Sequence, residues 1–260
     1  MIGIDFGFGA VEGELWRLLF AMTRIGAALL AAPFFGAAGV PMQLRVAIAG
    51  VIAVMICAWT PLPPPPALFS LQGILVVAGE VLVGLALGFV LQVIFAAPAI
   101  AAEVVSGAMG LSMAVTNDPA SGEHSTALGQ YFSVVLALIF LTLGAHLHFL
   151  SLVVESYRVF PPGETWLGAE RLHMIVGFGS EMFATAVAIA LPVALILFIV
   201  QVVTGVLSRS APSLNLFALG LPAGVLAGIA ALIAAAPLLA EQLIDLSHAA
   251  VADSASLLAR

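Results

Sequence analysis

The sequence predicts an all-α integral membrane protein built of helical hairpins, and three observations carry that prediction. The 260 residues are 63% hydrophobic and only 8% charged, with a mean hydropathy of +1.21, values that soluble domains do not reach. The apolar residues form solid runs, whereas a membrane β-barrel would show alternating residues. Most of these runs exceed the roughly 20 residues that a helix needs to cross a bilayer.

Six apolar stretches are predicted to be helical: residues 15–35, 45–59, 68–101, 128–154, 174–207 and 214–240. The third and fifth are long enough for two helical pieces or one long tilted helix. Pro98 and Pro192 predict kinks in them, because proline removes a backbone donor and clashes with the preceding turn. Pro61–Pro66 is expected to be a short, stiff polyproline connection.

One polar and flexible stretch, Ala102–Thr126, interrupts these apolar runs. A loop of this length inside a compact chain is more often functional or disordered than a plain connector. Composition alone leaves three interpretations open for it: a lid, the lining of a cavity, or a loose connecting segment.

The charged residues exclude several functional classes. Seven arginines and no lysine stand against 14 acidic residues, so the formal net charge is −7. This leaves no basic face for nucleic acid or for anionic lipid headgroups. The lone Cys57 excludes an internal disulfide and a cysteine-based metal site. Acidic residues precede the first arginine, so we expect no signal peptide.

The arginines do not predict the membrane topology, because the excess on either side is too small for the positive-inside rule. Two explanations are open. The arginines are simply too few, or the hairpins do not span the bilayer in the usual way.

Polar and small residues recur at helical spacing inside the apolar stretches. An ionisable group within a membrane is costly, so Glu80 and Glu181 are functional candidates by default. They either belong to an ion or proton pathway, or pair with an arginine or a backbone group where helices meet. We favour pairing, because no chain of acids continues as a relay would need. The candidate helix-packing and buried polar residues are Arg24, Glu80, Gly84, Gly88, Gln92, Glu181, Arg209, Gly220, Gly224 and Gly228.

No catalytic or metal-binding pattern is present in the sequence. His146 and His148 lie two residues apart and therefore on different sides of a helix, which makes a poor metal pair. The zinc-protease, nucleophile-elbow, phosphate-loop and dinucleotide fingerprints are absent, and Ser112 has no nearby base. We expect no enzymatic activity, no cofactor and no metal.

Five sequence segments, taken together, indicate a protein family. They are residues 24–50, 79–97, 102–121, 140–161 and 207–222. The first contains Ala-Ala-Pro-Phe-Phe and a Val-Pro turn, and the third contains Met109-Gly110-Leu111-Ser112 and Asn117-Asp118-Pro119. In this order the segments resemble the FliR family of subunits of the flagellar type III export gate. Each segment alone is weak evidence for the family, but the set covers most of the chain. The insert Gly122–His124 and the long acidic N-terminus depart from the family pattern.

The resemblance implies a non-enzymatic subunit that helps form the pore for export of unfolded flagellar proteins, in the inner membrane at the flagellar basal body. It implies FliP and FliQ as gate partners, FlhB as a further partner, and contacts with FlhA, rod proteins, exported proteins and membrane lipid. The family's hairpins are lifted largely above the membrane plane, which would explain the undecided topology. It also implies one domain over residues 1–260, in which residues 1–173 are FliP-like and residues 174–260 form a FliQ-like hairpin and tail.

In the family, the loop that matches Gly107–Pro119 projects into the pore as a plug. The resemblance therefore assigns plug roles to Gly107, Met109, Gly110, Leu111, Ser112, Met113, Val115, Asn117, Asp118 and Pro119. Its apolar side chains suit this role, because they can fill an irregular lumen and block ions by dewetting. The alternative is an amphipathic connector that packs against a neighbouring subunit.

Two alternative functions stay open. Six apolar segments with interior acids and arginines also fit a self-contained secondary transporter. The related export-gate subunit of the injectisome is the other alternative, although Met109–Ser112 and Asp118-Pro119 are closer to the flagellar branch.

Overall fold

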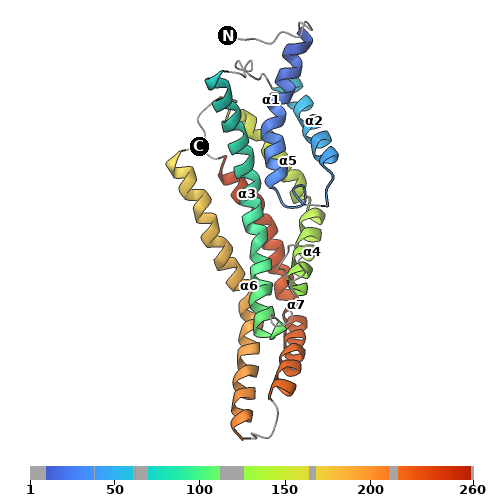
Figure 1. Cartoon of the computed structure of the whole chain (residues 1–260), viewed down its shortest axis with the longest axis vertical. Helices are drawn as coiled ribbons and strands as arrows, with labels where there is room; N and C mark the ends of the chain where they lie inside the picture. The colour runs from blue at the N-terminus through green and yellow to red at the C-terminus, as the bar shows by residue number, and fades with distance from the viewer. Residues whose placement is uncertain are drawn as a thin grey trace. The chain divides into compact units, whose positions relative to one another are not determined.

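The protein is helical throughout most of the chain that the computed structural model describes, which comprises residues 10–37, 39–60, 62, 70–111, 126–163, 168–210 and 216–258. These residues contain seven α-helices and no β-strand (Figure 1). The helices are α1 (Ala10–Ala31), α2 (Met42–Trp59), α3 (Leu71–Ala108), α4 (Ala127–Thr142), α5 (Ala145–Val159), α6 (Ala169–Ser210) and α7 (Leu216–Ser256). The predicted all-α class is confirmed.

Four of the described helices, α2, α3, α6 and α7, are long and apolar enough to cross a membrane, and the broken pair α4 and α5 adds a fifth span if it counts as one. The prediction of an integral membrane protein is thereby confirmed. The third and fifth apolar stretches form single helices of 38 and 42 residues rather than two pieces each. Both helices continue through Pro98 and Pro192.

Three predicted boundaries are wrong. The fourth stretch is two helices, because Gly144 adopts a left-handed conformation with φ of +69° and begins α5, a conformation that glycine tolerates and other residues resist. Helix α3 runs to Ala108, so the beginning of Ala102–Thr126 is helical. Helix α7 continues past Ala240 to Ser256, because its last turns become polar without losing helix-forming residues.

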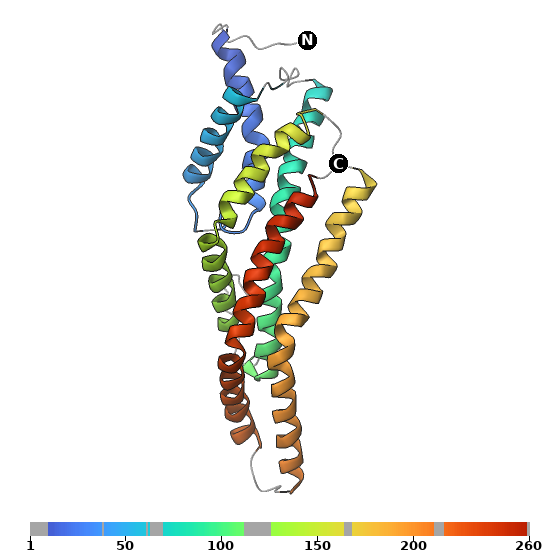
Figure 2. The ribbon, with the colours of Figure 1, turned by 180° about the vertical axis from the view of Figure 1, so that it is seen from behind.

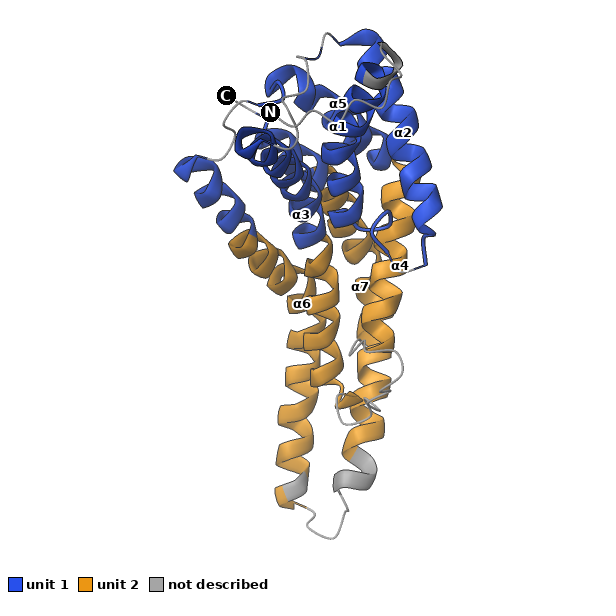
Figure 3. Ribbon diagram, turned by 45° about the horizontal axis from the view of Figure 1, so that its top comes forward, with its two compact units in different colours: residues 1–94, 144–178, 249–260 blue, residues 95–143, 179–248 orange. Residues whose placement is uncertain are grey.

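The chain packs as two compact units, which Figure 3 colours separately. Unit 1 consists of residues 1–94, 144–178 and 249–260, and unit 2 consists of residues 95–143 and 179–248. Each unit therefore contains segments from both the N-terminal and the C-terminal parts of the sequence. The division into 1–173 and 174–260 follows family likeness rather than packing, and it stays a prediction.

Unit 1 is organised by a close contact between α1 and α3. Gly84 and Gly88 of α3 face the backbone of α1, where a Cβ atom at Gly88 would lie 2.5 Å from the Ala28 carbonyl oxygen and 2.7 Å from the Ala31 Cβ. At Gly84, a Cβ would lie 2.8 Å from the Ala27 Cβ. Small residues four apart let two helix backbones approach this closely. Helices α1 and α2 form the hairpin beside this contact (Figures 1 and 2).

Unit 2 is held largely by apolar contacts. Phe95 of α3 and Phe140 of α4 meet edge to face, with ring centroids 5.0 Å apart. Helices α6 and α7 run side by side in this unit (Figure 2). On α7, Gly224 and Gly228 leave room for the side chain and backbone at the end of α3.

Substituting Gly84 by alanine should separate α1 from α3 and destabilise the protein. Overpacking of this kind costs about 1–3 kcal/mol. Gly79→Ala is the matched control, because a Cβ at Gly79 meets nothing within 4 Å and alanine is the better helix former. Thermal unfolding of the two purified variants in mild detergent measures the difference. Equal melting temperatures would contradict the close approach.

Candidate functional site

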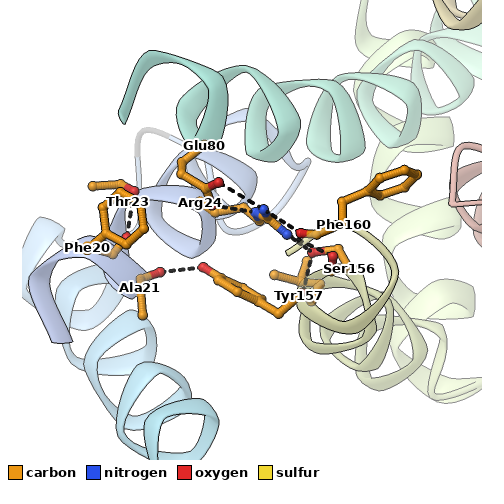
Figure 4. A network of polar contacts seen from close by, with 9 residues as sticks. Phe20, Ala21, Thr23, Arg24, Glu80, Ser156, Tyr157 and Phe160 are labelled. Carbon is orange, nitrogen blue, oxygen red and sulfur yellow. Dashed lines mark hydrogen bonds and ion pairs between the residues drawn. The ribbon is translucent and has the colours of Figure 1, made fainter. Parts of the chain in front are cut away.

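The guanidinium of Arg24 on α1 lies in the interior of unit 1, beside Glu80 of α3 (Figure 4). Arg24 is 1% exposed and Glu80 is 3% exposed. The Arg24 Nε donates to Glu80 Oε2 at 2.8 Å, and the Arg24 Nη2 donates to Glu80 Oε1 at 3.0 Å. This parallel two-bond geometry is the strongest form of an arginine–carboxylate pair.

The other donors of Arg24 reach the end of α5. Its Nη1 donates to the Ser156 carbonyl oxygen at 2.8 Å and to the Ser156 hydroxyl at 3.2 Å. Its Nη2 also donates to the Phe160 carbonyl oxygen at 2.9 Å. All five N–H donors of the guanidinium are thereby used. The charge also lies at a helix C-terminus, where a cation is favourable.

Tyr157 of α5 completes this network. Its ring stacks against the guanidinium, whose central carbon lies 4.3 Å from the ring centroid, an arrangement that adds cation–π attraction. Its hydroxyl donates to the Ala21 carbonyl oxygen of α1. The Arg24 network (Arg24, Glu80, Ser156, Tyr157 and Phe160) therefore ties α1, α3 and α5 together through the interior of unit 1.

This geometry bears on the two interpretations of Glu80. Both carboxylate oxygens are engaged by Arg24, and within the described ranges no group of three or more histidine, cysteine or acidic residues is placed to hold a metal ion. A proton relay needs successive titratable groups within hydrogen-bonding reach. The arrangement supports a structural pairing of Glu80.

Three residues expected to be buried are exposed in the described chain: Gln92, Glu181 and Arg209. For Gln92 the reason is geometric. A step of four residues turns about 40° around a helix that has 3.6 residues per turn. Three such steps from Glu80 carry Gln92 about 120° around the helix, off the face that Gly84 and Gly88 share. Glu181 and Arg209 lie on faces of α6 that no described residues cover.

The start of the predicted plug lies at the end of α3 in unit 2. Gly107 belongs to the last turn of α3, and Met109, Gly110 and Leu111 follow it. Gly110 has a left-handed φ of +80° and ends the helix, which is the usual role of glycine at a helix C-terminus. The remaining predicted plug residues lie outside the described residues: Ser112, Met113, Val115, Asn117, Asp118 and Pro119.

Met109 is not exposed but packs into a notch on α7. Its side chain is 4% exposed. A Cβ at Gly228 would lie 2.5 Å from the Met109 Cγ and 2.7 Å from its sulfur, and a Cβ at Gly224 would lie 3.2 Å from its carbonyl oxygen. Gly224 and Gly228 therefore form the notch, whereas Gly220 only lines a nearby cavity. The flexible thioether suits such an irregular space.

A set of hydrogen bonds, the α3–α4 clasp, joins the two described ends of the predicted plug region. The Thr126 backbone N–H donates to Glu103 Oε1 at 3.0 Å, and the Ser106 hydroxyl donates to the Thr126 hydroxyl oxygen at 3.2 Å. That same oxygen accepts the Gly129 N–H at 3.1 Å and caps α4. The clasp fixes where the chain leaves α3 and where it re-enters α4.

Gln201 of α6 fixes the end of α3 from a third side. Its Nε2 donates to the Ala108 carbonyl oxygen at 2.8 Å, one of the carbonyls that a helix end leaves without a partner. Gln201, Met109 and Gly110 also line a mostly apolar cavity of about 560 Å³ between α3, α6 and α7. The base of the predicted plug is thus anchored by contacts with α4, α6 and α7.

Sequence reasoning missed Glu103, Ser106, Thr126, Ser156 and Gln201. Thr126 carried a usable signal, since threonine directly before an apolar run is a typical helix N-cap. Ser156 and Phe160 act mainly through backbone carbonyls, which no residue pattern reveals.

Breaking the Arg24–Glu80 pair should destabilise the protein strongly. Arg24→Met leaves Glu80 buried without its partner, and removing one member of a buried pair costs about 3–5 kcal/mol. The double variant Arg24→Met/Glu80→Leu should lose less than the sum of the two single variants, because it leaves no unpaired charge. A thermodynamic cycle from detergent unfolding measures this. Strict additivity would show that the two residues do not interact.

Loss of the clasp should loosen the start of α4. Thr126→Val keeps the shape but removes the oxygen that caps the helix, at a cost of about 0.5–2 kcal/mol. Thr126→Ser keeps that oxygen and serves as control. Hydrogen exchange of the α4 first-turn amides should accelerate in the valine variant only. Equal exchange in both variants would rule out the cap.

Comparison with known proteins places this chain in a family. The family described as bacterial export proteins, family 1, matches residues 15–250. The flagellar biosynthetic protein FliR of Escherichia coli (strain K12) is 32% identical over 225 residues, which cover 86% of this chain and 84% of the relative. FliR of Bacillus subtilis (strain 168) is 32% identical over 207 residues, which cover 78% and 80%. The chain therefore belongs to the FliR family of bacterial export proteins and is a membrane component of flagellar protein export.

Proposed function

We propose that this chain is a non-enzymatic subunit of the flagellar type III export gate in the bacterial inner membrane, where it helps form the pore for unfolded flagellar proteins. FliP and FliQ are its partners in the gate, with FlhB and FlhA beside it at the basal body. The family match over residues 15–250 is the observation that carries this proposal.

We further propose that residues 107–119 plug the pore. Two features support this. The chain leaves α3 at a base anchored by Gln201, by the clasp and by Met109 in its glycine notch. The residues that follow Met109 in the sequence include Leu111, Met113 and Val115, which are apolar and suited to a constriction that blocks ions by dewetting.

The surface of the described chain fits a protein that works among other membrane proteins and lipid. Large apolar side chains are exposed along α2 and α6, including Val51, Trp59, Phe183 and Phe198. A soluble monomer rarely exposes contiguous apolar area on this scale. The assembly proposed above, with hairpins partly lifted above the membrane plane, would cover such faces with neighbouring subunits.

The secondary-transporter alternative finds little support in the described residues. Glu80 is fully engaged by Arg24, and Glu181 lies on an exposed helix face. We expect no solute flux through the purified chain alone.

Deleting Met109–Val115 should make the assembled gate leak ions, because the apolar seal and its seat on α7 are both lost. Replacing the same residues by a glycine–serine segment of equal length is the matched control for loop length, and it should leak as well. Ion flux through membrane vesicles that contain the assembled gate measures the effect. A gate that stays tight in both variants would contradict the plug but not the membership of the gate.

A further inference from the structure

Helix α1 carries an arginine in the middle of its apolar stretch. Arg24 is the only charged residue between Arg17 and Arg45 in the sequence, and its neighbours along the helix are apolar or small. An arginine at the centre of a helix makes insertion into a membrane about a hundredfold less favourable. An arginine also cannot become neutral by losing its proton. Helix α1 alone is therefore poorly suited to an apolar environment.

Helix α2, which forms a hairpin with α1, offers no counter-charge. It contains no acidic residue, and its buried side chains are small or apolar. Glu14 lies near the start of α1, where its Oε1 is 3.2 Å from Arg17 Nη1 on the surface. The next acidic residue in the sequence is Glu80. The first carboxylate after the hairpin, and the one that pairs with Arg24, thus belongs to α3.

Helix α3 does not have the same limitation. It is long and apolar enough to cross a membrane although it contains Glu80, and a carboxyl group in an apolar environment can bind a proton and become neutral. Gly84 and Gly88 leave space for the α1 backbone on the face that carries Glu80. Helix α3 can therefore enter the membrane by itself and present to α1 both a carboxylate and room for close packing.

The other acceptors of the Arg24 guanidinium come still later in the sequence. They are the Ser156 and Phe160 carbonyl oxygens, which lie 132 and 136 positions after Arg24. Tyr157 beside them donates to the Ala21 carbonyl oxygen of α1 (Figure 4). The polar contacts that hold Arg24 thus come from helices that follow the α1–α2 hairpin along the chain.

We propose that α1 does not hold its position as an independent membrane helix but docks onto α3, which must supply Glu80 before Arg24 can enter the apolar interior. The dependence is one-sided, because α1 requires Glu80 whereas α3 does not require Arg24. An ordinary structural ion pair would depend equally on both of its members. The inference concerns the folding of this chain and does not rest on the proposed function.

Thiol labelling of the full chain in opened membrane vesicles tests this dependence. Cys57, the only cysteine, is replaced by alanine, and Leu29→Cys then provides a reporter at a position of α1 that is 1% exposed. A water-soluble maleimide reacts with the thiolate, so a thiol that is packed or lies in lipid reacts slowly. Glu80→Leu should raise the labelling rate at least about tenfold, because α1 with an unpaired arginine moves into water.

Arg24→Met tests whether the dependence is one-sided. This substitution weakens the folded state, but it removes the central charge of α1, so the reporter at Leu29 should stay protected. The double variant Arg24→Met/Glu80→Leu should protect the reporter as well. Glu155→Leu is the matched control for loss of an acidic residue, because Glu155 is exposed in unit 1. It should leave the labelling rate unchanged.

A second reporter separates release of α1 from unfolding of the whole chain. Leu136→Cys lies at a fully buried position of unit 2 and should stay protected in the Glu80→Leu variant. Three results would overturn the inference. They are a protected Leu29 reporter in Glu80→Leu, equal exposure of that reporter by Glu80→Leu and Arg24→Met, and exposure of both reporters together in Glu80→Leu.

Discussion

The buried guanidinium of Arg24 constrains the rest of unit 1. Taking this charge out of water is costly, and the cost is offset only while every donor has an acceptor. Those acceptors come from Glu80 on α3 and from the end of α5, at distances of 2.8–3.2 Å. A shift of any of the three helices by one residue would leave a buried donor or acceptor unpaired. The network therefore fixes the register of α1, α3 and α5.

The glycines of α3 make that network possible. Gly84 and Gly88 follow Glu80 by one and two turns, and they bring the backbone of α3 against Ala27, Ala28 and Ala31 of α1. A larger residue at either position would hold the helices apart and lengthen the Arg24–Glu80 bonds. Close packing and ion pairing thus depend on the same contact, in agreement with the general use of small residues between membrane helices.

Unit 2 is built differently, and the difference suits a component of flagellar export. No charged side chain is buried among its described residues. Its polar contacts gather instead at the end of α3, where Glu103, Ser106, Thr126 and Gln201 hold the chain on either side of residues 112–125. The Gln201 amide and the exposed Glu103 carboxylate bind backbone atoms there, and the Ser106 and Thr126 hydroxyls bind each other. None of these contacts carries the desolvation cost of a buried charge. The plug proposed above would need such an anchored starting point.

Much of the fold could be predicted because apolar composition and length report directly on membrane helices. The same signal failed at Gly144, where a single left-handed residue divides an unbroken apolar run, and at Ala240, where hydrophobicity ends before α7 does. Glu80, Gly84 and Gly88 lie on the face of α3 that meets α1, whereas Gln92 is exposed on another side of the helix. The exposure of Glu181 on α6 could not be predicted from the sequence, because residue spacing alone does not reveal which helix face a neighbour covers.

The sequence by itself determined the all-α membrane class, the location of the apolar helices and the family, because each depends on residue identity along the chain. Tertiary structure alone decided the rest. It paired Arg24 with Glu80 across 56 positions, seated Met109 against Gly228 and joined Glu103 to Thr126. These contacts depend on which helix faces meet in space, and a linear pattern of residues carries no information on which of its possible partners will lie opposite.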